Sequence, residues 1–138
     1  MKKILIDSDV CLDLITVRYP FFQEANRLFS LVENGNFEGV ISADSFSNIY
    51  YILRKFSNSS KAREQIKNLR KITNVGEIRT SSIDSALASE WNDFEDAIQH
   101  ACAVENECDA IISRNKQDYK KAELPVLTAM EFLQKISE

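Results

Sequence analysis

The sequence contains little of the material from which linkers, zinc sites and membrane spans are made. Its 138 residues include only 3 glycines, 2 prolines and 1 histidine. So few turn-forming residues leave little room for linkers or low-complexity segments, and the length suits a single domain over residues 1–138. Because 44% of the residues are hydrophobic, the chain has enough apolar surface for one continuous core.

Long apolar runs are also missing. The residues after Met1 resemble the start of a signal peptide, but the first apolar run ends at Asp7. That run is too short for a signal-peptide core or a membrane span, so we expect a cytoplasmic protein without a membrane partner. The 3 cysteines lack the spacing of a zinc site. Cys11 and Cys102 lie among apolar neighbours, so we expect buried, reduced thiols.

Charge is distributed unevenly, although the net charge is only −4. Residues 54–79 carry a local charge of +6, whereas residues 80–110 carry −8 and contain neither lysine nor arginine. A basic segment beside an acidic one suits a protein that holds a polyanion on one element and cations on another. The alternative is two solvated helix faces without a function.

Hydrophobic patterning predicts short strands that alternate with helices. We expect strands over residues 3–6, 39–41, 76–80, 109–113 and 125–127. We expect helices over residues 10–15, 20–34, 46–56, 59–72, 83–88 and 94–105, and a last helix that a capping box starts at Thr128. This alternation predicts an α/β fold with a mostly parallel central sheet and helices on both faces. Ligands in such folds bind at the carboxyl ends of the strands.

Acidic and amide side chains gather around these expected strand ends. They follow the first strand, start helix 94–105, and follow the strand that comes after it: Asp7, Asp9, Asp93, Asp96, Asn115 and Asp118. A functional site explains this pattern. Ordinary helix capping explains Asp93 and Asp96 equally well, because acids at a helix start favour the helix dipole.

The first segment by itself suggests a phosphatase. DSDVCL resembles the Asp-x-Asp motif of haloacid-dehalogenase-type phosphatases, in which one aspartate is the nucleophile and the other the acid/base. Such enzymes also need a lysine and paired acids directly after a later strand. Here Asp93 and Asp96 precede their strand, so the likeness is confined to one short segment.

The whole chain resembles the PIN-domain ribonucleases, the family that includes VapC-type toxins. The matching segments occur in the family's order: LIDSDVCLDLI, ISADSFSNIYYILRK, DFEDAIQHACA and CDAIISRNKQDYKKAELPVLTAMEFL. The resemblance implies a PIN-like three-layer α/β/α sandwich and metal-dependent endoribonuclease activity. It also implies Mg²⁺ or Mn²⁺ as cofactor and RNA as substrate. The partners that it implies are an antitoxin protein and a second copy of the chain in a homodimer.

Carried over by position, the resemblance places the metal ligands and the catalytic residues. Asp7 is the ligand after the first strand, Asp96 is the ligand on the late helix, and Asp118 or Asn115 closes the site. Asp93 lies one helical turn before Asp96 and faces the same side. Carboxylates suit the role because hard divalent cations prefer oxygen ligands and lower the pKa of bound water.

One position departs from the family pattern. Asn48 stands where family members usually have a glutamate, and a neutral amide is a weaker ligand. Asp9 is a candidate to compensate, because the family more often has asparagine or serine there, and Asp44 is a weaker one. The alternative function is therefore a catalytically weak PIN-like module that binds RNA or a protein.

Basic and aromatic residues near the end of helix 46–56 are candidates for RNA contacts. We expect four basic residues to contact phosphates: Arg54, Lys55, Lys61 and Arg63. The first two also suit a helix C-terminus without any RNA. Three aromatic residues are candidates for stacking on bases, with core packing as the alternative: Tyr50, Tyr51 and Phe56.

Overall fold

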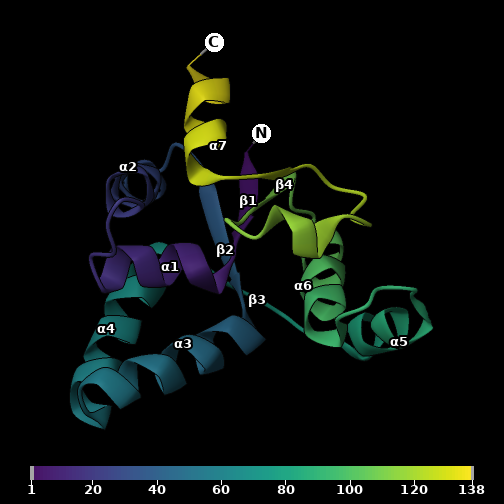
Figure 1. The fold of residues 1–138 in the computed structure, drawn as a ribbon, viewed down its shortest axis with the longest axis horizontal. Coiled ribbons are helices and arrows are strands. Elements are labelled where there is room, and N and C mark those ends of the chain that lie inside the picture. The colour runs from purple at the N-terminus through teal and green to yellow at the C-terminus, as the bar shows by residue number, and fades with distance from the viewer. Residues whose placement is uncertain (1, 138) are drawn as a thin grey trace.

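The protein is an α/β fold built on a five-stranded, all-parallel sheet (Figure 1). The structure is a computed structural model that describes residues 2–137, so Met1, where the signal-like segment begins, and Glu138 lie outside it. The strands are β1 (Lys3–Ile6), β2 (Glu38–Ser42), β3 (Asn74–Gly76), β4 (Ala110–Ile112) and β5 (Val126–Leu127). They pair in the order β3-β2-β1-β4-β5. The predicted fold class is confirmed.

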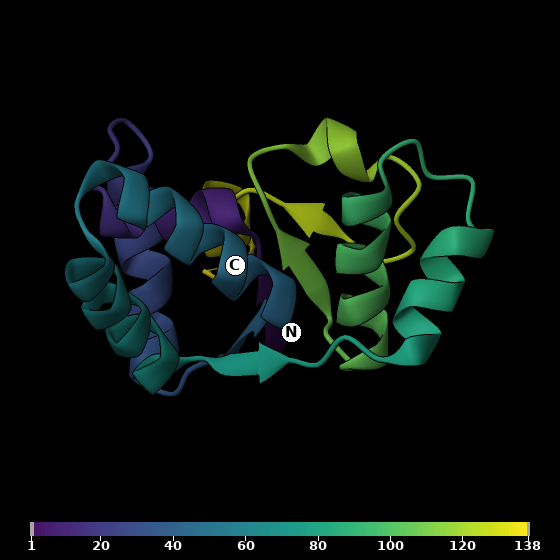
Figure 2. The same cartoon turned by 90° about the horizontal axis from the view of Figure 1, so that it is seen from below.

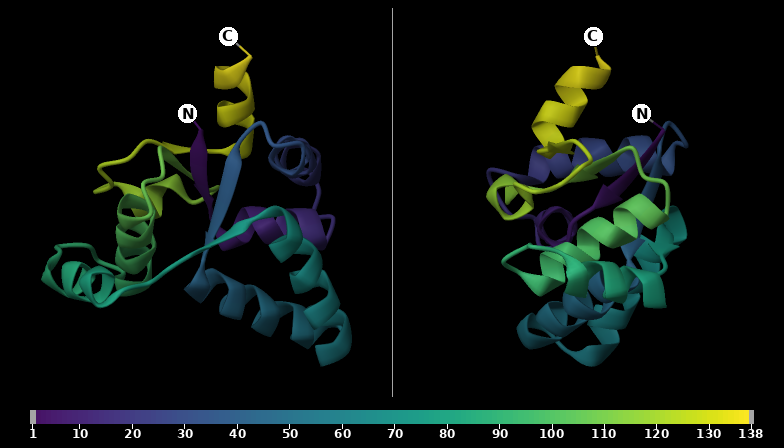
Figure 3. Two further views of the ribbon diagram at one scale, coloured as in Figure 1. Left: turned by 180° about the vertical axis from the view of Figure 1, so that it is seen from behind. Right: turned by 90° about the vertical axis from the view of Figure 1, so that its right-hand side faces the viewer.

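Helices cover both faces of the sheet, as Figure 2 shows. The helices of one layer are α1 (Ser8–Ile15), α2 (Phe22–Glu33), α3 (Ala43–Phe56), α4 (Ser59–Ile72) and α7 (Ala129–Ile136). The other layer holds α6 (Phe94–Glu105) and the 3₁₀ turn η1 (Lys116–Tyr119), and α5 (Thr80–Ala88) packs against α6. Figure 3 shows the two layers from behind and from the side. None of the helices within residues 2–137 is long and apolar enough to cross a membrane.

The central strand β1 divides the core into two parts. Ile4 and Ile6 pack into the layer of α1, α2 and α3, whereas Leu5 packs into the layer of α6. All three side chains are fully buried. Successive side chains of a strand point to opposite faces, so a strand covered on both sides needs a continuous apolar run. That requirement explains why Ile4, Leu5 and Ile6 are all apolar.

Three helices begin earlier than the apolar pattern predicts, because polar residues form their first turns. α1 begins at Ser8, α3 at Ala43 and α5 at Thr80. Asp7 is the N-cap of α1, and Ser42 caps α3 by accepting the Ser45 N–H at 3.0 Å. The predicted bounds of α6 and the capping box before α7 are confirmed.

The predicted strand over residues 76–80 is wrong. β3 ends at Gly76, and Thr80 already begins α5. After Gly76 the chain leaves the sheet, and the carbonyl of Glu77 accepts a hydrogen bond from Asn106 Nδ2 at 3.1 Å. A Cβ on Gly76 would lie 2.8 Å from Sγ of Cys102 in α6. The glycine therefore marks a close approach of strand and helix.

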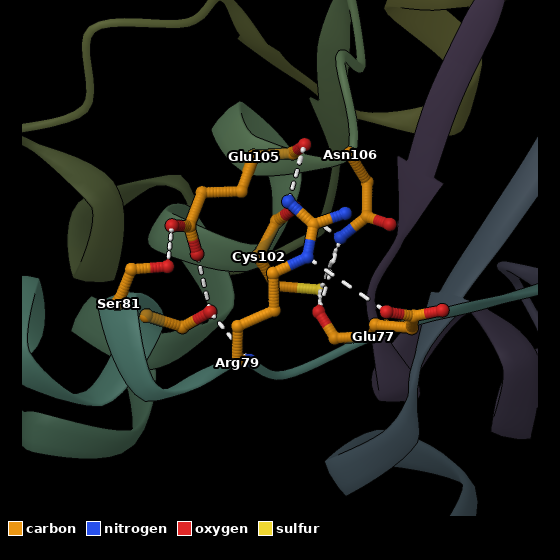
Figure 4. A network of polar contacts seen from close by, with 7 residues as sticks. Glu77, Arg79, Ser81, Cys102, Glu105 and Asn106 are labelled. Carbon is orange, nitrogen blue, oxygen red and sulfur yellow. Dashed lines mark hydrogen bonds and ion pairs between the residues drawn. The ribbon is translucent and has the colours of Figure 1, made fainter.

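Glu105 fixes the start of α5 to the end of α6 (Figure 4). Its carboxylate accepts hydrogen bonds from the hydroxyls of Ser81 and Ser82, and these bonds lower the pKa of Glu105. Arg79 donates to the backbone carbonyl of Glu105 at 3.4 Å. These contacts hold the far end of α6, the helix whose first turn supplies the acids described below.

The cysteines are structural. Cys11, Cys102 and Cys108 are buried free thiols, as predicted for the first two. Burial raises the pKa of Cys102 to about 11 and that of Cys108 to about 12. The raised pKa values keep these thiols protonated, and the thiolate is the reactive form. These residues therefore act as small apolar side chains in the core.

Candidate active site

The carboxyl ends of β1 and β4 lie side by side and supply the first polar groups of the site. Ile6 pairs with Ile112 in the register of these strands. The backbone N–H of Asp7 then donates to the carbonyl of Ile112 at 2.9 Å, which extends the ladder by one residue. Asp7 and Ser113 therefore emerge next to each other at the edge of the sheet.

The carboxylate of Asp7 is held by four hydrogen-bond donors. Oδ1 accepts from the N–H of Ser8 at 2.8 Å and from Nε2 of Gln99 at 3.4 Å. Oδ2 accepts from Oγ of Ser113 at 2.8 Å and from the hydroxyl of Tyr119 at 3.0 Å. The donors come from α1, α6, the end of β4 and η1, so the orientation of Asp7 depends on the whole fold.

Asp9 does not cap α1, because Asp7 has that position. Its Oδ2 accepts the backbone N–H of Arg114 at 3.0 Å. Its Oδ1 is buried and has no hydrogen-bond partner within residues 2–137. Burial, and then the charge of Asp7, raise the pKa of Asp9 to about 6. A carboxylate oxygen buried without a donor is costly unless a cation or proton meets it.

Asp96 lies in the first turn of α6. Burial raises the pKa of Asp96 to about 7, and the charges of Asp93, Asp118 and Asp7 add to the effect. The backbone N–H of Asp96 donates to Oδ1 of Asp93 at 2.9 Å, so Asp93 is the N-cap of the helix, as the capping interpretation predicts. Several carboxylates thus act on Asp96 together.

A cavity of about 550 Å³ collects most of the predicted ligands at this edge of the sheet. Five carboxylates from α1, α3, α6 and the end of β1 line it: Asp7, Asp9, Asp44, Glu95 and Asp96. Asn48 and Asn115 line it too. Sequence reasoning placed Asp7, Asp9, Asp96, Asn48 and Asn115 in one site, and the fold brings them together.

The remaining two predicted ligands lie in a neighbouring pocket. Asp93 and Asp118 line a space of about 170 Å³ with Trp91, and Asp96 belongs to the lining of both spaces. The 3₁₀ turn η1 directs Asn115 into the main cavity and Asp118 into the smaller one. The sequence left this choice between the two residues open.

Sequence reasoning missed four residues of the site. Glu95 lines the cavity, and Gln99, Ser113 and Tyr119 hold Asp7. Glu95 could have been found, because it precedes Asp96 in the first turn of the same helix. The other three have no local signal, because their contacts with Asp7 join distant parts of the chain.

The four predicted RNA-contact bases divide into two pairs. Arg54 and Lys55 end α3 and lie against the ring of Tyr51, which lines the acidic cavity. Lys61 and Arg63 are exposed on the first turns of α4 and do not line that cavity. The first pair is therefore the one adjacent to the site.

The donor set of the cavity fits a hard divalent cation. Within residues 2–137, no three acidic, histidine or cysteine side chains already lie in positions that would hold a metal ion. The carboxylates nevertheless face one space, one Asp9 oxygen is unpaired, and Asp9 and Asp96 have raised pKa values. A cation that prefers oxygen ligands, such as Mg²⁺ or Mn²⁺, would offset the repulsion between these carboxylates.

Known proteins resemble the chain over nearly its whole length. Ribonuclease VapC1 of Aquifex aeolicus is 24% identical over 139 residues, covering 97% of this chain and 95% of that protein. The structure of DNA-bound VapBC from Salmonella typhimurium superposes with a TM-score of 0.71 at 12% identity, covering 94% of this chain and 99% of that chain. A toxin-antitoxin complex from Klebsiella pneumoniae gives a TM-score of 0.69 at 20% identity, covering 91% and 97%.

The sequence model described as the PIN domain matches residues 3–117. The matched range includes β1 through β4 and every residue that lines the cavity except Tyr119. The resemblance found in the sequence is therefore confirmed. The chain belongs to the PIN domain family.

Proposed function

We propose that the protein is a metal-dependent endoribonuclease of PIN type and the toxin of a toxin–antitoxin pair. The observation that carries this proposal is the cavity at the carboxyl edge of the sheet, lined by five carboxylates from four segments. The similarity to Ribonuclease VapC1 and to toxin–antitoxin complexes supports the same activity.

Four residues of the cavity bind Mg²⁺ or Mn²⁺ in this proposal. Asp7 and Asp96 are the principal ligands, Asp9 contributes its unpaired oxygen, and Asn115 adds a neutral one. When bound, the cation lowers the pKa of water and offsets charge on the phosphate. Asp118 assists from the neighbouring pocket through its effect on Asp96.

Asp44 and Asp9 supply the negative charge that is missing at Asn48, where the family usually has a glutamate. Asp44 precedes Asn48 by one turn of α3, and both line the cavity. Asp9 reaches the same space from α1. The site thus retains an acidic α3 side, although the acid is not at the usual position. This arrangement favours an active nuclease over a binding module.

A cleavage assay tests the proposal. The full chain should cut single-stranded RNA in the presence of Mn²⁺ or Mg²⁺ and lose this activity in EDTA. Asp7→Asn and Asp96→Asn should each lose most of the activity, whereas Asp84→Asn, an exposed acid on α5, should retain it. Wild-type protein that cuts no RNA with either cation, or cleavage that survives Asp7→Asn, would refute the proposal.

A thermal-shift titration separates the nuclease from the binding-module alternative. Mn²⁺ should raise the melting temperature, and Asp96→Asn should reduce the shift, because a bound ligand stabilises the folded state. A melting temperature that does not respond to Mn²⁺, together with tight RNA binding, would favour the binding module. The phosphatase alternative predicts turnover of a generic phosphate ester that Asp9→Asn abolishes.

The proposed partners are RNA, an antitoxin protein and a second copy of the chain. The complexes similar to this chain pair a toxin with its antitoxin, which supports the second of these. Growth arrest on expression, relieved by the product of an adjacent small gene, tests the antitoxin. Light scattering of the purified chain tests the homodimer, and a monomeric mass at all concentrations would contradict it.

A further inference from the structure

One face of α3 joins the acidic cavity to the basic end of the same helix. Asp44, Asn48 and Tyr51 line the cavity at intervals of one helical turn. Arg54 and Lys55 follow in the last turn of α3. Residues three or four positions apart lie on one helix face, so this face passes from carboxylate through amide and aromatic ring to two cations.

Tyr51 differs from its neighbour Tyr50 in what its ring contacts. The ring of Tyr50 packs against the core, whereas Tyr51 is 50% exposed. Nζ of Lys55 lies 4.5 Å from the centroid of the Tyr51 ring, and Cζ of Arg54 lies 5.6 Å from it. Tyr51 is therefore an aromatic surface at the cavity rim with two exposed positive groups beside it.

The chemistry of the cavity explains why such a surface is useful. Without a bound cation, five carboxylates repel an RNA backbone, so positive groups at the rim favour binding of the strand. Proteins that bind single-stranded nucleic acids combine aromatic side chains, on which nucleobases stack, with lysine and arginine side chains that contact the phosphates. Cation–π contacts at exposed positions are weak, so Arg54 and Lys55 are free to turn toward a phosphate.

We propose that Tyr51, Arg54 and Lys55 form a nucleotide subsite that stacks one unpaired base of the RNA and holds an adjacent phosphate. The inference deepens the proposed ribonuclease function and rests on it for the identity of the polymer. The subsite makes the protein select single-stranded RNA, because only an unstacked base can lie on the ring. It also sets the position of the strand relative to the cavity.

The surroundings of Tyr51 favour RNA over a protein partner. The exposed residues that lie three or four positions from Tyr51 on α3 are polar or charged: Ser47, Asn48, Arg54 and Lys55. The exposed ring of Phe56 lies at the end of the helix and does not line the cavity. A protein-docking surface needs a contiguous apolar centre, which these side chains do not give. Further exposed bases follow on α4. A polyanion matches this distribution of charge.

Fluorescence anisotropy with a short, labelled oligoadenylate in EDTA tests the subsite without cleavage. Tyr51→Ala should weaken binding about 5- to 150-fold, the range that loss of one base-stacking contact gives. Tyr51→Phe should bind within about twofold of wild type, because the ring remains. Leu87→Ala removes an apolar side chain that is 67% exposed on α5 and does not line the cavity, and it should leave binding unchanged.

Oligonucleotides with a single abasic position identify the stacked base. The effect of Tyr51→Ala should disappear for one abasic position only, because the ring then has no base to hold. Replacing Arg54 and Lys55 by glutamine should reduce the slope of log binding constant against log salt by about 1 to 2, since each phosphate contact releases counterions.

Three outcomes would overturn the inference. Tyr51→Ala could bind the probe as wild type does, or its loss could be equal at every abasic position. Alternatively, Tyr51→Ala could change the mass of the protein in light scattering while RNA binding stays constant, which would assign the ring to a protein contact. Failure of the ribonuclease proposal is distinguishable, because a chain that cuts no RNA can still show the abasic-position effect in EDTA.

Discussion

Tyr119 donates its hydroxyl hydrogen to Oδ2 of Asp7 over 3.0 Å, although the two residues are 112 positions apart in the sequence. The Tyr119 side chain is buried, and burial together with the charge of Asp7 raises the pKa of the phenol. The phenol is therefore protonated at neutral pH and donates this hydrogen bond there. This bond links the 3₁₀ turn η1 to the end of β1 and fixes one oxygen of Asp7, the proposed metal ligand.

Tyr119→Phe should lower the free energy of unfolding by about 1.5–3 kcal/mol, because a hydrogen bond to a charged group is lost. Urea denaturation should show a lower midpoint with an unchanged slope. Cleavage should weaken without being abolished, since Asp7 keeps Ser8, Gln99 and Ser113 as donors. Tyr51→Phe removes an exposed hydroxyl and is the matched control. A Tyr119→Phe midpoint equal to wild type would contradict this account.

Asp9→Asn should stabilise the metal-free protein and weaken its response to metal. The substitution removes one negative charge from the cavity, and the remaining amide oxygen still accepts the N–H of Arg114. In EDTA we expect a higher melting temperature than wild type, and in Mn²⁺ a smaller shift. Asp84→Asn should change neither value. An Asp9→Asn protein with the wild-type metal shift would show that the unpaired oxygen does not reach the cation.

The sequence predicts the parts of the site that follow from chain direction. Asp7 stands where an apolar run ends, and Asp96 stands where an amphipathic helix begins, so strand and helix periodicity place both at one edge of the sheet. Tyr119 and Gln99 were not predictable, because their role depends on contacts between distant segments. The strand β3 was misplaced because it is only 3 residues long and Gly76 belongs to its end.

Local geometry also decided between Asn115 and Asp118, which the sequence could not rank. Both follow β4, and either could have closed the site. The 3₁₀ turn over Lys116–Tyr119 sends them to different spaces. A turn of this kind has no strong apolar period, so its direction is set by packing. Tyr119 is the buried residue of that turn, and its hydrogen bond to Asp7 fixes the direction.

His100 should give the protein a pH-dependent fluorescence signal. Burial lowers the pKa of His100 below 6.5, and its Nε2 accepts the backbone N–H of Glu123 at 3.0 Å. The ring stacks on Trp91, with centroids 5.0 Å apart, and Trp91 is the single tryptophan of the sequence. Protonation removes the acceptor and places a quenching charge beside the indole. Tryptophan emission should therefore fall in a transition with its midpoint below pH 6.5.

The stability linked to His100 has a defined sign. The folded state binds this proton less readily than the unfolded state, so the contribution is complete above pH 6.5 and is lost as the pH falls toward the folded pKa. Urea midpoints measured across this interval check the prediction. His100→Gln keeps an acceptor without a titrating ring and should remove the fluorescence transition. A transition that persists in this variant would assign it to another group.

Val17 is a strained residue in the loop between α1 and α2. Its φ is 51°, in the left-handed region that β-branched side chains rarely adopt, and its side chain is 49% exposed. Val17→Asn should therefore raise the free energy of unfolding by about 1 kcal/mol, because asparagine tolerates this conformation and little apolar contact is lost. Val104→Asn is the control, since Val104 is 40% exposed on the helix α6 and has no such strain to relieve. Equal urea midpoints for Val17→Asn and wild type would show that the loop holds no strain at this position.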